Sequence, residues 1–172
     1  MDALEAILTR RSCRSYTSRQ VEPAVLDKVV EAGRYAPSGM GRQPWRFVVL
    51  RDADEISRLS EMNARIMGVS SDPFYGAPTV IVVLVDPSVP TCVEDGALAL
   101  GNMMVAAQAL GVSSCWIHRA KEEFESDEGK ALLGKWGVEG TWRGVGHCAL
   151  GYPSKDPAEP KPRREGVVTY VG

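Results

Sequence analysis

The chain has 172 residues, enough for one domain, and its 44% content of apolar residues can fill a hydrophobic core. Its formal net charge is only −2, so the molecule as a whole offers no field to attract nucleic acid or an anionic membrane. The N-terminal segment lacks the basic start and long apolar stretch of a signal peptide, and the scattered cysteines form no CxxC pair. We therefore expect a cytoplasmic protein with free thiols that binds no nucleic acid, membrane or metal ion.

Apolar periodicity and turn residues predict alternating helices and strands. Asp2, with Glu5 three residues later, is typical of a helix N-terminus, and Pro23 suits the first position of a second helix. The β-branched run between Pro78 and Asp86 predicts the clearest strand. The expected elements are helices 2–10 and 23–36, strand 47–50, helix 52–67, strand 78–86, helix 94–110, strand 113–118, helix 122–135 and strand 145–150. This alternation predicts an α+β or α/β layer structure.

The C-terminal segment differs from the rest of the chain. Residues 154–164 combine prolines with the basic residues Lys155, Lys161, Arg163 and Arg164 and have no apolar face, which predicts an extended arm. A solvated tail is the alternative, although the spacing of the prolines favours a defined contact. Residues 167–171 predict one last short strand. We divide the chain into a core at 1–153 and an arm at 154–172 of the same domain.

The turn after the first helix is rich in arginine. Arg10, Arg11 and Arg14 crowd together with the hydroxyl group of Ser12. Guanidinium and hydroxyl groups suit a phosphate, which offers several acceptor oxygens and negative charge. The alternative is a helix C-terminus whose arginines only complement the helix dipole. This cluster alone does not decide between the two.

Two further segments are candidates for ligand contact. Between Pro37 and Pro44, glycines allow the backbone to approach a ligand closely, and Gln43 can read the edge of a heterocycle. His118 and Arg119 follow an expected strand, and ligands of open α/β sheets lie beyond the carboxyl ends of strands. An ordinary turn and ordinary surface residues are the respective alternatives.

One motif match is rejected. Gly144–Ala149 fits the dinucleotide fingerprint G-x-G-x-x-G/A, but that fingerprint must follow a strand and open a helix. Here it begins a strand that runs into Gly151-Tyr152-Pro153. The segment therefore predicts strand packing and no nucleotide site.

Five segments, in order, resemble the FMN-dependent nitroreductase family along nearly the whole chain. They are Arg10, Ser12 and Arg14 for R-x-S-x-R; residues 37–45 for P-S-x-x-N-x-Q-P-W; Leu110–Ile117 after an Ala-rich helix; Gly151-Tyr152-Pro153; and Lys161 with Arg163 for a basic Lys-x-Arg. Gly41 stands where the family usually has Asn, so one side-chain hydrogen bond to the flavin is missing.

The resemblance implies α/β/α layers with a mixed central sheet, an obligate homodimer and two FMN molecules at its interface. The implied phosphate ligands are Arg10, Arg11, Ser12, Arg14, Lys161 and Arg163. The residues implied to pack on the flavin from the other chain are Pro37, Ser38, Gly39, Met40 and Gln43. Those implied to lie near the flavin face or its N5 edge are Ile117, His118 and Arg119.

The resemblance also implies a function. NADH or NADPH would reduce the flavin at N5, and a nitroaromatic, quinone or similar conjugated acceptor would then be reduced in a ping-pong cycle with no catalytic side chain. We expect Arg10 and Arg14 to serve the phosphate, and Arg11, ahead of His118 or Arg119, to supply a cation at the reduced ring. The alternatives are another flavin reaction, such as reductive dehalogenation or flavin cleavage, and a non-enzymatic flavin-binding or redox-sensing protein.

Overall fold

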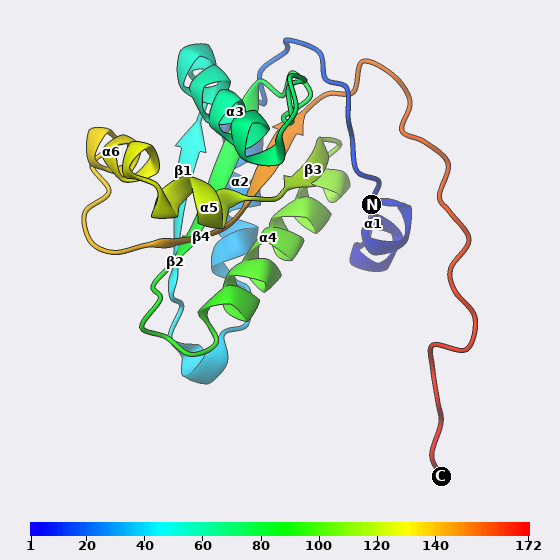
Figure 1. Ribbon diagram of the computed structural model, residues 1–172. Helices are drawn as coiled ribbons and strands as arrows, with labels where there is room; N and C mark the ends of the chain where they lie inside the picture. The colour runs from blue at the N-terminus through cyan, green and yellow to red at the C-terminus, as the bar shows by residue number, and fades with distance from the viewer.

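Four strands form the central sheet of the computed structural model, which describes residues 1–172 (Figure 1). They are β1 (Trp45–Leu50), β2 (Thr79–Val85), β3 (Ser113–Ile117) and β4 (Arg143–Gly151), in the order β1-β2-β4-β3. All three ladders are antiparallel. The expectation of a mixed sheet is therefore corrected: the parallel pairing is a single bridge between Ser12 and Ser114 at the outer side of β3.

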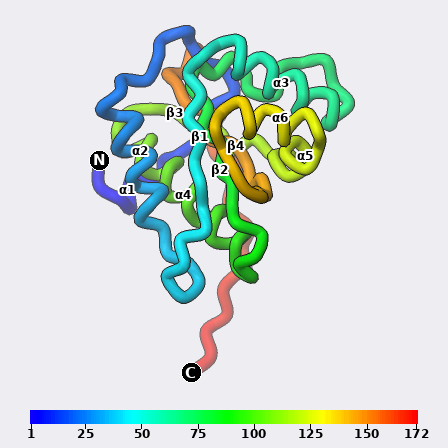
Figure 2. Tube along the Cα trace, turned by 90° about the vertical axis from the view of Figure 1, so that its left-hand side faces the viewer, coloured from blue at the N-terminus to red at the C-terminus, as the bar shows by residue number.

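Helices cover both faces of this sheet (Figures 1 and 2). One face carries α3 (Ala53–Met67), α5 (Ala120–Glu125) and α6 (Asp127–Lys135), and the other carries α2 (Pro23–Arg34) and α4 (Cys92–Ala109). The layered α+β architecture expected from the sequence is thus confirmed. No helix is both long enough and apolar enough to cross a membrane.

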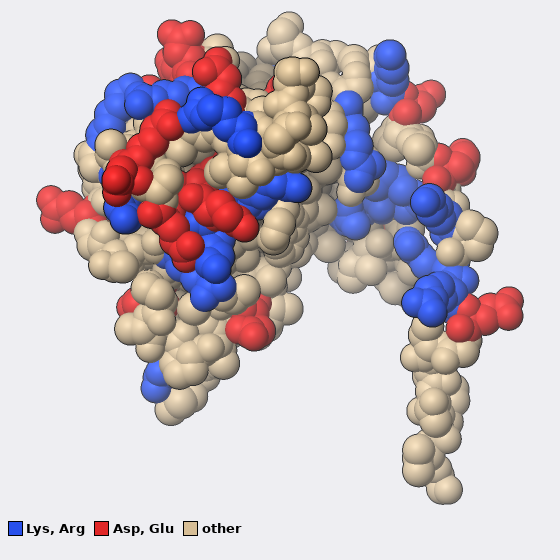
Figure 3. Space-filling view, viewed as in Figure 1, with Lys and Arg blue, Asp and Glu red and all other residues tan.

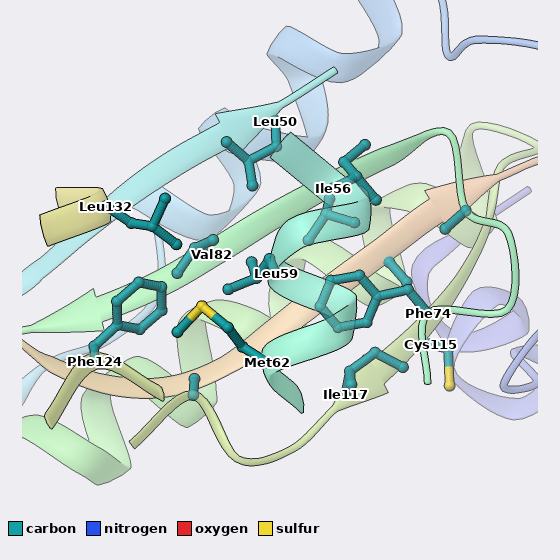
Figure 4. Packing of buried hydrophobic residues seen from close by; sticks show 14 of the residues in the cluster. Leu50, Ile56, Leu59, Met62, Phe74, Val82, Cys115, Ile117, Phe124 and Leu132 are labelled. Carbon is teal, nitrogen blue, oxygen red and sulfur yellow. The ribbon is translucent and has the colours of Figure 1, made fainter. Parts of the chain in front are cut away.

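Strand β2 joins the two halves of the core, because every one of its residues is buried. Val80, Val82 and Leu84 pack with residues of α3, α5 and α6, and Figure 4 shows Val82 in this cluster. The alternate residues of β2 pack against α2 and α4. This alternation follows from the two-residue period of a strand. A strand buried on both faces explains why its sequence reads as an unbroken apolar run.

Most expected elements are found within two residues of their predicted bounds, but the helix expected at 122–135 is two helices. Ser126 lies between them with extended backbone (φ −74°, ψ 157°), and its hydroxyl accepts a hydrogen bond from the Gly129 amide at 3.0 Å. It is the N-cap of α6, and such a cap interrupts the preceding helix. The rejected fingerprint lies inside β4, where a Cβ on Gly146 would come 2.6 Å from Nε1 of Trp116.

The segment between α1 (Ala3–Thr9) and α2 crosses one end of the sheet. Ser12 bridges to β3, Tyr16 bridges to Pro153 after β4, and the Gln20 amide donates to the Pro78 carbonyl before β2 at 2.9 Å. The arginine turn is therefore held against the sheet by backbone pairing.

Helix α1 and the arm stand apart from this layered core. Asp2 caps α1 by accepting from the Glu5 amide at 2.9 Å, yet only Ala6 of the helix is buried. The arm passes α1 and then projects away from the body, exposed along its whole length (Figure 1). The strand expected at 167–171 is wrong for the single chain, because no other strand lies beside it to pair with its backbone.

Candidate functional site

The arginine turn is fixed against the edge of β3. The Cys13 amide donates to the Ser114 carbonyl at 3.0 Å, next to the bridge between Ser12 and Ser114. On the helix side, the Gln108 amide of α4 reaches the Thr9 hydroxyl at 3.4 Å. The turn is thereby placed between the last part of α4 and the start of β3.

Two buried polar atoms at this turn lack partners. Neither Nη1 of Arg10 nor Oγ of Ser114 makes any hydrogen bond. Arg10 as a whole is only partly buried, but a buried donor atom without an acceptor is costly, and an anionic ligand would satisfy it. Burial raises the pKa of the Cys115 thiol, while the charges of Arg14 and Arg10 act in the opposite direction.

Arg11 has a different environment. Its guanidinium donates to the carbonyls of Leu8, at 3.0 Å, and of Arg10, at 2.8 Å. These are free carbonyls at the end of α1, so Arg11 follows the helix-end alternative.

Two hydrogen bonds hold the loop between Pro37 and Pro44, one to α4 and one within the loop. The Gly39 amide donates to Asp95 of α4 at 2.9 Å, and the Gln43 amide donates to the Ser38 hydroxyl at 3.0 Å. The short 3-10 helix η1 (Gly39–Gly41) leaves Met40 88% exposed at a positive φ of 55°. An exposed large apolar side chain held in a strained conformation is typical of a contact surface.

This loop and the arginine turn lie at opposite ends of α4. The loop is attached at Asp95 and the turn at Gln108, which are separated by about 20 Å along a helix that rises about 1.5 Å per residue. One chain therefore does not bring these two predicted parts of the site together.

At the other end of β3, His118 is exposed and Arg119 adopts a left-handed conformation with φ 78°. Ile117 before them is buried. Ser114 and His118 are about 13 Å apart along the strand, at about 3.3 Å per residue. An elongated ligand lying along the β3 edge would span from the arginine turn to His118.

Beyond its first residue, the arm contributes charge and makes no hydrogen bond to the rest of the chain. Lys161 and Arg163 are exposed, and Lys and Arg side chains gather where the arm passes α1 (Figure 3). Only its first residue is attached, through the Ser154 amide to the Ser15 carbonyl at 3.0 Å. The predicted phosphate role of Lys161 and Arg163 therefore stays a prediction.

Comparison with known proteins decides the family. The model of the nitroreductase family matches residues 7–73 and 65–152. The chain belongs to the nitroreductase family. A curated relative from Archaeoglobus fulgidus, provisionally named an NADH dehydrogenase/NAD(P)H nitroreductase, is 32% identical over 160 residues, which span 90% of this chain and 87% of the relative. Another with that name, from Methanothermobacter thermautotrophicus, is 34% identical over 67% of this chain and 60% of its own length.

The nitroreductase fold extends to the whole chain. A nitroreductase from Bacteroides fragilis, solved with bound FMN, superposes with a TM-score of 0.93 at 31% identity, covering 100% of both chains. The layers of helices on both faces of the sheet, implied by the resemblance, are thereby confirmed.

Sequence reasoning missed a buried polar cluster behind the β3 end of this nitroreductase. Asn63, Glu123 and His147 are each fully buried and joined by hydrogen bonds. Only His147 left a signal, as a polar residue within an otherwise apolar strand. Asn63 and Glu123 lie in helices with many polar residues, where nothing marks them as buried.

A large cavity lies elsewhere in the fold. It measures about 520 Å³ between α3 and the loop that contains Asp72, and hydroxyl groups of Ser57, Ser60 and Ser71 are among its lining. None of the residues predicted to bind flavin lines it.

Proposed function

We propose that the protein is an FMN-dependent oxidoreductase that takes reducing equivalents from NADH or NADPH and passes them to a small conjugated acceptor, such as a nitroaromatic compound or a quinone. The observation that carries this proposal is the buried, unpartnered Nη1 of Arg10. It lies in a chain that superposes along its whole length on a nitroreductase with bound FMN.

The residues at the arginine turn suit the FMN phosphate. Arg10 offers an unpaired donor, Ser12 is fixed by its bridge, and Ser114 adds a buried hydroxyl without a partner. Arg14 is exposed beside them and supplies a second positive charge. Charge-assisted hydrogen bonds of this kind are the strong ones. When bound, FMN supplies hydride transfer through its N5 atom.

A cation near the reduced ring comes from Arg119 in this proposal. Arg11 was the first candidate, but its guanidinium is engaged by the carbonyls at the end of α1. Arg119 is half-buried at the end of β3 and has no ion pair. Its charge would favour the electron-rich flavin over the oxidised one.

We also propose that the site is completed in a homodimer. Leu4, Ile7 and Leu8 of α1 are 66%, 56% and 63% exposed. Val171 and Tyr170 of the arm are 95% and 94% exposed. The three side chains of α1 share one face of the helix, whereas the end of the arm projects away from the body (Figure 1), and exposed apolar groups of this kind are typical of an interface. A second chain would cover them and could bring its Pro37–Pro44 loop to the arginine turn.

An absorption spectrum of the purified protein, followed by anaerobic addition of NADH and then NADPH, tests the proposal. We expect a flavin spectrum that bleaches with at least one donor and recovers on addition of a nitroaromatic or a quinone. Failure to bind added FMN would contradict the proposal. Tight FMN binding without reduction by either donor would favour the redox-sensing alternative, and recovery only with halogenated phenols would favour dehalogenation.

A further inference from the structure

The fully buried residues Asn63 of α3, Glu123 of α5 and His147 of β4 form one hydrogen-bonded unit. Nδ2 of Asn63 donates to Oε1 of Glu123 at 2.9 Å, and the other carboxylate oxygen is bonded to Nε2 of His147. The imidazole packs against Phe74 and Phe124, with ring centroids 5.2 and 6.2 Å away. The unit therefore ties three elements together inside the apolar core of one sheet face.

The same unit holds the turn at the end of β3. Nδ2 of Asn63 also donates to the His118 carbonyl at 2.7 Å, and the Glu123 amide donates to the Arg119 carbonyl at 3.1 Å. The His118 carbonyl thus points toward the buried unit, whereas the bond from Glu123 to Arg119 is the first backbone hydrogen bond of α5, of which Arg119 is the N-cap. The amide groups of His118 and Arg119 have no acceptor within the chain.

Arg119 is strained, because a residue with a Cβ rarely adopts φ 78°. Such a conformation persists only where the surroundings determine it, and it is common at functional sites. Here the surroundings are the two hydrogen bonds from Asn63 and Glu123. Glu123 is itself fixed, since the Ser126 hydroxyl donates to its carbonyl at 2.5 Å and Gly129 packs directly against that carbonyl.

We propose that Asn63, with Glu123 and His147 behind it, is a positioning residue that holds the His118–Arg119 turn in the conformation that faces the flavin. The proposal rests on the proposed function for its flavin part. None of the three residues touches the ligand: they act through the turn.

The test replaces Asn63 and compares it with a matched asparagine. Asn63→Ala removes both donors, and Asn102→Ala is the control, because Nδ2 of Asn102 also donates to a backbone carbonyl, that of Ala32, at 3.2 Å on the other sheet face. Asn63→Ser leaves one hydroxyl donor for the two acceptors, the His118 carbonyl and the Glu123 carboxylate. It provides the same test if Asn63→Ala does not fold.

In FMN-free protein, we expect faster amide hydrogen exchange across residues 118–124 in the Asn63 variants and no change there in Asn102→Ala. In FMN-loaded protein, the flavin potential should fall and reduction by NAD(P)H should slow by roughly 10- to 100-fold, as is typical of a small misplacement of reacting groups. FMN affinity should change by less than about threefold, because the phosphate contacts are distant.

The two readouts separate the two ways of failing. If wild-type protein binds no FMN, the proposed function is wrong, and exchange in the FMN-free protein still decides whether Asn63 orders the turn. If wild-type protein is reduced normally and the Asn63 variants match Asn102→Ala in exchange, potential and rate, the positioning role is overturned while the proposed function stands.

Discussion

The middle of the sheet and the region beyond β3 differ in how completely a single chain buries its apolar side chains and pairs its polar groups. Around β2, apolar side chains are buried on both faces, and even the charged Glu123 has partners within the chain. Beyond β3, Leu8 is exposed, Nη1 of Arg10 is unpartnered and the arm lies free. The first region contains what one chain needs to fold. The second contains what it offers to a ligand and a partner.

Deleting the arm should have the largest effect of the changes considered, and it should affect only the region beyond β3. Without residues 155–172 we expect loss of both FMN and the dimer, because the basic groups of the arm and its contact with the partner disappear together. The far-UV circular dichroism of the core should remain, since the deleted residues are exposed. Analytical ultracentrifugation and FMN titration measure this.

A variant that keeps the arm but lacks its charge sharpens the result. The double replacement Lys161→Ala with Arg163→Ala should lose FMN affinity and stay dimeric. A truncated protein that remains yellow and dimeric would reduce the arm to a solvated tail.

The next effect belongs to the core. His147→Ala removes a fully buried imidazole from the core and leaves Oε2 of Glu123 without its hydrogen-bond partner, which should cost about 3–5 kcal/mol of unfolding free energy. The exposed His118 is the control, because His118→Ala should change stability by less than about 0.5 kcal/mol. Urea unfolding of both variants measures the difference. A loss below about 1 kcal/mol for His147→Ala would show that the buried pair contributes little to stability.

Arg10→Ala should act on the ligand and spare the fold. Removing one charged hydrogen bond should weaken FMN binding by about 1.5–3 kcal/mol, or roughly 10- to 150-fold, while the potential of bound flavin stays nearly unchanged. Arg34→Ala is the control, since Arg34 is exposed and pairs with Glu31 on α2. If Arg10→Ala keeps wild-type affinity, the arginine turn is only a helix end.

Two glycines of α6 give the smallest and most local test. A Cβ on Gly129 would lie 2.0 Å from the Glu123 carbonyl oxygen, so Gly129→Ala should cost about 1–3 kcal/mol of stability. Nothing lies within 4 Å of a Cβ on Gly134, so Gly134→Ala should stabilise by about 0.5–1 kcal/mol. Thermal unfolding compares them. Equal effects would mean that α5 and α6 are not closely packed at Glu123.

The sequence predicted the first region better than the second. The spacing of apolar residues, together with the positions of proline and glycine, located most helices and strands. Burial of one side of a helix or strand against the sheet leaves a regular apolar pattern in the sequence. The break at Ser126 was missed because the helices on either side are both charged and share no marked apolar stripe. The residues of the site remain predictions, and the pattern cannot show that the loop near Asp95 and the turn near Gln108 are far apart. Long-range hydrogen bonds such as Asn63 to His118 leave no local trace.

The full burial of β2 also has a consequence for biosynthesis. Its β-branched run pairs on one side with β1, already made, and on the other with β4, which begins at Arg143. At ribosomal speeds of about 5–20 residues per second, β4 emerges about 3–12 s after β2. During that interval one edge of an uncharged, strand-forming segment is open to other nascent chains, and such segments aggregate readily. Shielding of β2 until residue 151 has been synthesised would therefore favour productive folding in the cell.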